Sequence, residues 1–88
     1  MIDVNMAEDA FRTSRVMKVL GNPLRYRMYN LIHEQEPLKT GDLAEILNRK
    51  KNSISQHVSK LKKLDLIYSK RDGRNVYHYI KRDDVYEI

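Results

Sequence analysis

The stretch from Thr40 to Leu64, TGDLAEILNRKKNSISQHVSKLKKL, predicts two short helices joined by a tight turn. The first helix is expected to begin at Thr40, whose hydroxyl can cap the free amides of the first turn. Asp42 follows at a position where the positive end of the helix dipole favours an acid. Asn48 is expected to end this helix, because asparagine tolerates the left-handed conformation better than most residues other than glycine. A turn over residues 48–51 then leads into the second helix.

The second helix of the pair, expected over residues 52–64, has one narrow apolar stripe. Ile54, Val58 and Leu61 recur at helical spacing, so this stripe should pack against the core. The remaining side chains are amides, hydroxyls and cations: Asn52, Gln56, Ser59, Lys60 and Lys63 lie opposite the stripe, with Ser53 and Ser55 at its edges. Such side chains suit a helix in a DNA major groove, where amides bond to base edges and lysines contact phosphate. An ordinary solvated helix face is the alternative interpretation.

Positive charge is concentrated in the second half of the chain. Of the net charge of +5, residues 1–48 contribute −1 and residues 49–88 contribute +6. Between Arg49 and Lys63, six lysines and arginines, including Lys51, occur without a single acid. A solvated surface usually mixes the two signs, so this run predicts a polyanionic partner such as nucleic acid.

The length and composition limit the class of protein. Its 88 residues predict one domain with a small core, and pairing with a second copy would add buried surface. The absence of cysteine removes disulfides, thiolate metal sites and cysteine nucleophiles. The sequence shows no glycine-rich phosphate loop and no paired carboxylates beside a histidine, so we expect neither an enzyme nor a cofactor. No apolar run has membrane-spanning length, and the first residues are acidic where a signal peptide is basic, so a cytoplasmic location is expected.

A further helix is predicted over residues 5–20, where Asn5 and Glu8 resemble a capping box. Its apolar face is wider than a single contact requires. This face consists of Met6, Ala10, Phe11, Val16, Met17, Val19 and Leu20. Such a face either covers the core of its own chain or pairs in part with a second subunit. On the second interpretation the dimerisation residues are Met6, Ala10, Phe11 and Met17.

Another helix is predicted between residues 22 and 34. Gly21 is expected to end the preceding helix, and Asn22 with Pro23 marks the new start, with asparagine as the cap and proline in the first turn. The buried stripe is expected to consist of Leu24, Met28, Leu31 and Ile32. Off this stripe we expect Arg25, Arg27 and Tyr29, the arginines either reaching phosphate or forming ion pairs. Pro37 ends the helix, because proline disfavours helical geometry in the residue before it.

A β-hairpin is predicted after the helix pair. Asp65 should adopt the left-handed conformation at the helix exit, and strands are expected over residues 66–70 and 76–80. The sequence between them, RDGRN, contains Asp-Gly, a strong hairpin signal. Three of its side chains can donate to phosphate or to a groove edge: Arg71, Arg74 and Asn75. The strand tyrosines, for which packing on the hairpin is favoured over stacking on nucleic acid, are Tyr68, Tyr77 and Tyr79.

This order of elements is that of a winged helix-turn-helix domain, a mostly helical α+β fold with four to five helices and a two-stranded hairpin wing. The sequence resembles the ArsR/SmtB family of small dimeric bacterial and archaeal repressors over about residues 17–80, in the segments VLGNPLRYRMYNLI, TGDLAEILN, SISQHVSKLKKLDLI and RDGRNVYHYI. Asn22 to Arg25 stands where that family has Asp-Pro-x-Arg. Ser55 to His57 stands where it has Ser-His-His, and Gly73 to Tyr77 matches its wing.

The resemblance implies a single domain with three parts: a dimerisation helix over residues 1–20, a helix-turn-helix over residues 40–64 and a wing over residues 66–80. It implies a sequence-specific duplex DNA-binding transcriptional regulator, a repressor that binds an inverted-repeat operator as a homodimer. It assigns the groove to Asn52, Ser53, Ser55, Gln56 and His57, and the wing contacts to Arg71, Arg74 and Asn75. His57 lies near the edge of the apolar stripe, so a packing role and a DNA contact both stay open. Because the fold alone does not fix the ligand, a winged helix that binds RNA or a protein partner is the alternative.

The chain departs from the family at its metal sites. The family's Cys-x-Cys pair corresponds to residues 39–42, where no cluster of metal ligands occurs, and residues 81–88 suffice for one helical turn rather than a long metal-binding helix. His33, His57 and His78 show no metal-binding spacing, so no metal is expected and a metal-responsive repressor is the less favoured alternative. Lys50 stands where a small capping residue is usual, so the recognition helix is expected to start at Asn52.

Overall fold

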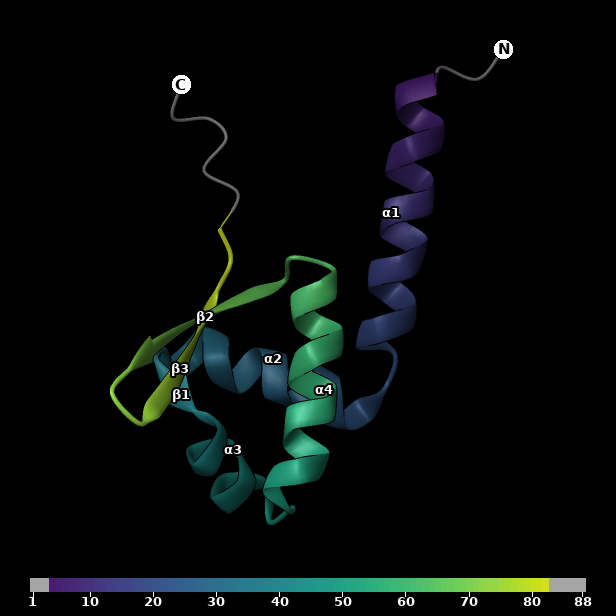
Figure 1. The fold of residues 1–88 in the computed structure, drawn as a ribbon. Helices are drawn as coiled ribbons and strands as arrows, with labels where there is room; N and C mark the ends of the chain where they lie inside the picture. The colour runs from purple at the N-terminus through teal and green to yellow at the C-terminus, as the bar shows by residue number, and fades with distance from the viewer. Residues whose placement is uncertain (1–3, 83–88) are drawn as a thin grey trace.

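The structure, a computed structural model, describes residues 4–82, and describes the side chains from residue 10 onward. The elements run in the order α1 (Val4–Leu20), α2 (Pro23–Gln35), β1 (Leu38–Lys39), α3 (Thr40–Leu47), α4 (Lys51–Lys63), β2 (Ile67–Asp72) and β3 (Asn75–Ile80). Helices α2, α3 and α4 form one body with the sheet, and α1 extends away from it (Figure 1). The helical turn suggested for the tail falls mainly on residues 83–88, which lie outside the described part.

The core is built where α2, α3, α4 and the hairpin meet. Its largest fully buried side chains are Met28, Ile32, Leu43, Ile54, Leu61 and Ile67. The apolar stripe predicted for the recognition helix is confirmed, because Ile54, Val58 and Leu61 are all buried. Leu24 is only partly buried, and Tyr29, expected off the α2 stripe, instead packs against the core. The aromatic ring of Tyr29 widens the stripe of α2 beyond the four aliphatic positions.

Local residue choices set several helix boundaries as predicted. The Asn22 side chain accepts hydrogen bonds from the amides of Leu24 and Arg25 at 3.0 and 3.1 Å, and Pro23 opens α2. Asn48 ends α3 with a φ of 53° and Asp65 follows α4 with a φ of 55°, so both adopt the left-handed conformation.

Helix α3 begins at Thr40 as predicted, but its predicted cap and the predicted start of α4 are each wrong by one residue. The cap of α3 is Lys39 rather than Thr40, and the Asp42 carboxylate accepts the Lys39 amide at 2.9 Å. Helix α4 begins at Lys51 rather than at Asn52, with Lys50 in the cap position and no capping side-chain hydrogen bond. The backbone closes this first turn without a cap, because the Ile54 amide donates to the Lys50 carbonyl at 3.1 Å.

The sheet has three antiparallel strands in the order β1-β3-β2, where the sequence predicted a two-stranded hairpin. Strands β2 and β3 pair from Ile67 opposite Ile80 to Asp72 opposite Asn75, so they extend closer to the turn than predicted. The turn itself is residues 73–74, and Gly73 supplies its φ of 64°. The extra strand β1 has only two residues, too few to show a period of alternation.

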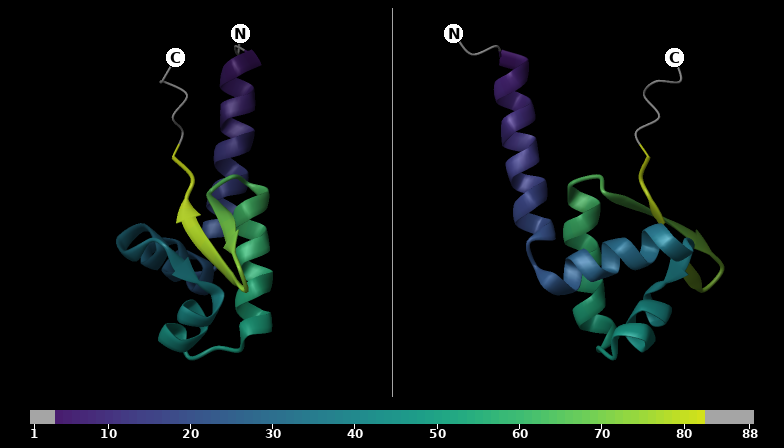
Figure 2. Two further views of the ribbon diagram at one scale, coloured as in Figure 1. Left: turned by 60° about the vertical axis from the view of Figure 1, so that its left-hand side comes forward. Right: turned by 180° about the vertical axis from the view of Figure 1, so that it is seen from behind.

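Strand β1 connects the wing to the helix-turn-helix. Leu38 lies opposite His78 and Lys39 opposite Tyr77, and α3 starts at the next residue. The hairpin turn and α1 lie on opposite sides of the α2, α3 and α4 body (Figure 2). Within the described residues, no helix combines the length and apolar character needed to span a membrane.

Candidate nucleic-acid interface

The outer face of α4 is open to solvent. The exposed side chains on this helix include seven that the sequence proposed for DNA: Lys51, Asn52, Ser55, Gln56, Ser59, Lys60 and Lys63. Ser53 and His57 are half-buried at the border with the apolar stripe. The helix therefore separates a buried apolar face from an exposed face of amides, hydroxyls and lysines, with no acid among them.

His57 lies at the border between these two faces. Its Nδ1 is buried and has no hydrogen-bond partner among the described residues, and the same holds for Nε of Arg25 on α2. Burial is the largest cause that lowers the pKa of His57 from its ordinary value of 6.5, followed by the charges of Arg25 and Lys60. A neutral imidazole at this position agrees better with the packing interpretation of His57 than with a phosphate contact.

A cleft joins the start of α3, the start of α4 and the wing turn. It is lined by Lys39, Thr40, Gly41, Asp42, Glu45, Lys51, Arg74, Asn75 and Val76. The Lys51 side chain runs across Gly41, where an added Cβ would lie 3.4 Å from Cε and 3.7 Å from Nζ of that lysine. Three cations, Lys39, Lys51 and Arg74, thus line one hollow together with two acids, Asp42 and Glu45, so the lining carries one net positive charge.

The cleft brings together residues that the sequence analysis treated separately. Lys51 was predicted in the turn before the recognition helix, within the acid-free cationic run, and Arg74 and Asn75 were predicted in the wing. All three line this hollow. Arg71 is exposed on β2 and does not line it. Lys39 and Gly41 were not predicted as part of this surface, and Lys39 joins it through the pairing of β1 with β3.

A buried histidine lies beside the cleft. His78 on β3 is 2% exposed, and its Nε2 lies 2.8 Å from the Thr40 hydroxyl while its Nδ1 lies 2.8 Å from the Ser69 hydroxyl. Burial lowers the pKa of His78 from its ordinary value of 6.5, with a smaller contribution from the charge of Lys62. The ring is therefore a neutral link between α3, β2 and β3. Thr40, predicted as a helix cap, makes this contact instead.

The opposite face of the wing carries stacked aromatic rings. Tyr68 and Tyr79 face each other across β2 and β3 with centroids 5.1 Å apart and ring planes 11° apart. Lys70 Nζ lies 5.9 Å from the first ring and 5.7 Å from the second. The predicted packing of tyrosines on the hairpin is confirmed for this pair.

The fold and the site together resemble one group of known proteins. A family model described as a helix-turn-helix domain matches residues 20–68 of the chain. The homodimeric winged helix-turn-helix DNA-binding domain of Mb0332 from Mycobacterium bovis, a provisional ArsR-family regulator, superposes with a TM-score of 0.82 at 22% identity, covering 98% of this chain and 79% of that one. This chain belongs to the helix-turn-helix domain family, and its fold is that of ArsR/SmtB-like winged helix-turn-helix proteins.

Two curated relatives of this ArsR/SmtB-like chain are named as regulators of transcription. The cadmium resistance transcriptional regulatory protein CadC from Listeria innocua is 35% identical over 74 residues, which cover 83% of this chain and 61% of that protein. The transcriptional repressor SdpR from Bacillus subtilis is 32% identical over 65 residues, which cover 74% of this chain and 71% of that protein. The chain thus spans about three fifths of the length of CadC.

The first helix of this ArsR/SmtB-like domain exposes large apolar side chains. Phe11 and Met17 are each 67% exposed, and Ala10 is exposed as well. Val19 and Leu20, at the end of the same helix, pack against the core. The wide face therefore divides into a core-packing end and an exposed part. Met6, the fourth predicted dimerisation residue, lies outside the described side chains.

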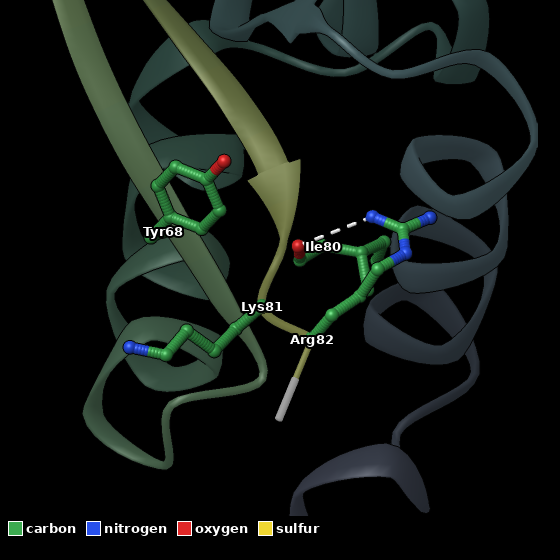
Figure 3. Close-up of a pocket in the computed structure, with 4 residues that line it drawn as sticks. All are labelled: Tyr68, Ile80, Lys81 and Arg82. Atoms are coloured by element: carbon green, nitrogen blue, oxygen red, sulfur yellow. Dashed lines mark hydrogen bonds between the residues drawn. The ribbon is translucent and has the colours of Figure 1, made fainter. Parts of the chain in front are cut away.

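A second hollow lies at the end of the wing far from its turn. It is lined by Tyr68, Ile80, Lys81 and Arg82, and Arg82 Nη1 lies 3.5 Å from the Ile80 carbonyl oxygen (Figure 3). The Arg82 guanidinium also pairs with Glu36 at the end of α2 and holds the pKa of that carboxyl below its ordinary value. Glu36 further accepts the Ile80 amide at 3.2 Å, so these residues fasten the last strand to α2.

Metal ligands do not cluster in the described part of the chain. No group of three or more histidine, cysteine, aspartate or glutamate side chains there could hold a metal ion. His78 uses both ring nitrogens in hydrogen bonds, and His33 lies on α2 with its ring 6.4 Å from that of Tyr29.

Proposed function

We propose that this chain is a transcriptional repressor that binds duplex DNA sequence-specifically, as a homodimer on an inverted-repeat operator. The observation that carries the proposal is the exposed face of α4, which has amides and lysines without an acid and lies beside the cationic cleft of the wing. Similarity to a protein named as a repressor, SdpR, supports the direction of regulation.

Base reading is assigned to the middle of the outer face of α4. Gln56 and Asn52 carry amides that can bond to an adenine edge in two places at once. Ser53 and Ser55 have short side chains that allow the helix to approach the base pairs. Gln56 is exposed and lies one turn after Asn52, so the two amides can address neighbouring base pairs.

Phosphate contacts are assigned to the cations around this face. Lys60 and Lys63 extend along α4, while Lys51, Lys39 and Arg74 surround the cleft. A phosphate group in the cleft would receive charge from the helix-turn-helix and from the wing together. The remaining wing donors, Arg71 and Asn75, would meet the adjacent backbone.

The dimer is assigned to the exposed part of α1. Phe11 and Met17 place two large apolar side chains in solvent on a helix that extends beyond the body. A second copy that covers them would bring two recognition helices to one duplex. Two-fold symmetry then requires half-sites about one helical turn, roughly 34 Å, apart in an inverted repeat.

The test is selection of bound sequences from a random duplex pool, followed by affinity measurement across a salt series. We expect an inverted repeat, with log affinity that falls against log salt by about 0.9 for each neutralised phosphate. Lys60→Ala should reduce the magnitude of this slope by about 0.9, the amount that one phosphate contact contributes. Salt-insensitive binding, or a preference for single-stranded RNA over duplex DNA, would contradict the proposal and support the RNA-binding alternative.

A further inference from the structure

His78 is the one buried polar or charged residue among those that the structure describes. Its neighbours in the sheet are Leu38 on β1 and Ser69 on β2, so it occupies the middle strand between the other two. An aliphatic side chain would fill such a position without demanding any particular angle. A ring with two hydrogen-bonding nitrogens demands both distance and direction from its partners.

The two partners of His78 belong to different functional parts. Ser69 lies on the wing strand β2, and Thr40 is the first residue of α3 and lines the cationic cleft. In a neutral imidazole one nitrogen donates and the other accepts, and a hydroxyl can take either role, so both bonds are satisfied at once. The Thr40 bond spans 38 residues and joins two segments that local structure does not hold together, whereas Ser69 is the cross-strand neighbour of His78 within the hairpin.

We propose that His78 is a positioning residue for DNA binding, holding the wing turn at a fixed distance from the start of the helix-turn-helix through its bonds to Thr40 and Ser69. The inference rests on the proposed DNA-binding function. Arg74 in the turn and Lys51 on α4 both line the cleft. When this pair of His78 hydrogen bonds, here called the relay, is intact, both cations contact the same stretch of DNA backbone. When it is broken, the wing contributes to binding independently of α4 or not at all.

A double-mutant cycle tests whether His78 acts through the wing. His78→Phe removes both bonds and retains a ring, and it is combined in turn with Arg74→Ala on the wing and Gln56→Ala on α4. We expect Arg74→Ala to weaken operator binding at least about threefold less in the His78→Phe background than in the wild type. The effect of Gln56→Ala should be the same in both backgrounds.

Two outcomes would overturn the positioning role. The first is an equal effect of Arg74→Ala in both backgrounds. The second is an equal reduction of the Arg74→Ala and Gln56→Ala effects, which marks a general loss of structure. If His78→Phe does not fold, Thr40→Val removes only the bond that joins β3 to α3. The same cycle is then run with that variant, with the same direction expected and the same outcomes contradicting it.

Hydrogen exchange in the absence of DNA separates this inference from the proposed function. His78→Phe should raise amide exchange of β1 and of the β2–β3 turn at least about tenfold, while the core amides of α2 keep their protection. Unchanged exchange in the wing would overturn the relay even if DNA binds. Faster wing exchange in a protein that binds no duplex DNA would retain the relay as a link between wing and helices and reject its role in binding.

Discussion

At the scale of single residues, the exposed face of α4 carries an amide and a cation that we expect to contact different parts of the DNA. Gln56 and Lys60 are one helical turn apart, and both are exposed. An amide can distinguish one base pair from another, whereas an ammonium group meets a phosphate that every sequence presents.

Exchanging these two residues for alanine should therefore have different consequences. Gln56→Ala should cost about 1–3 kcal/mol on the preferred operator and relax base preference at one position of each half-site. Lys60→Ala should weaken specific and random duplexes by the same factor. Competition binding with both kinds of DNA measures the contrast. Equal loss on operator and random DNA for Gln56→Ala would show that this helix does not read bases.

The two buried or half-buried imidazoles make stability depend on pH. The pKa values of His57 and His78 are both lowered in the folded protein, chiefly by burial. The unfolded chain therefore binds protons that the folded chain does not. Their stabilising effect is fully present above the unfolded value of about 6.5 and decreases as the pH falls through the lowered folded values.

Urea unfolding between pH 7.5 and 5 should thus show a falling free energy of unfolding. His57→Gln should flatten part of this decrease, because the amide does not titrate in that range. A free energy of unfolding that stays constant, or that rises towards pH 5, would contradict the assignment of neutral imidazoles.

At the scale of elements, α2 depends on the asparagine that precedes it. Asn22 is the only capping side chain that accepts from two amides at a described helix start. Helix α2 supplies Met28 and Ile32 to the core, so fraying of its first turn affects the whole domain.

Asn22→Ala should lower the free energy of unfolding by about 1 kcal/mol, because two amides lose their acceptor. Asn22→Asp keeps the acceptor and is the matched control, with stability expected close to that of the wild type. Thermal or urea unfolding measures both variants. Equal destabilisation by alanine and by aspartate would show that the cap does not set the stability of α2.

At the scale of the whole molecule, the exposed part of α1 governs assembly. Phe11→Glu should release monomers and weaken operator binding far more than loss of one phosphate contact, because one recognition helix per complex is lost. Thr13→Glu adds the same charge to an exposed position on the other side of the helix and serves as control. Sedimentation of all three proteins tests this. A wild-type monomer of 10.5 kDa at micromolar concentration that still binds one half-site at full strength would contradict the dimer.

Metal response is also a property of the whole assembly. With no metal-ligand cluster in residues 10–82, we expect zinc or cadmium to leave operator affinity unchanged. Titration of either metal into the DNA complex measures the coupling, with a chelator as control. A tenfold loss of affinity would correspond to a coupling of about 1.4 kcal/mol and would contradict this expectation.

The sequence by itself determined the features that depend on neighbouring residues. The cap at Asn22, the left-handed residues Asn48 and Asp65, and the buried stripe of α4 follow from side chains within about one turn of each other. Such interactions act over a few residues, so periodicity and capping preferences contain the required information.

Only the tertiary structure decided the features that join distant segments. Strand β1 exists because β3, nearly 40 residues later, pairs with it, and that pairing makes Lys39 the cap of α3 and brings it to the cleft. The Thr40 hydroxyl bonds to His78 across 38 residues rather than to the amides of its own helix. A threonine hydroxyl gains a similar hydrogen-bond energy from a helix amide and from a histidine ring nitrogen. Local preference therefore does not decide between these two partners, and the packing of the wing against the helices does.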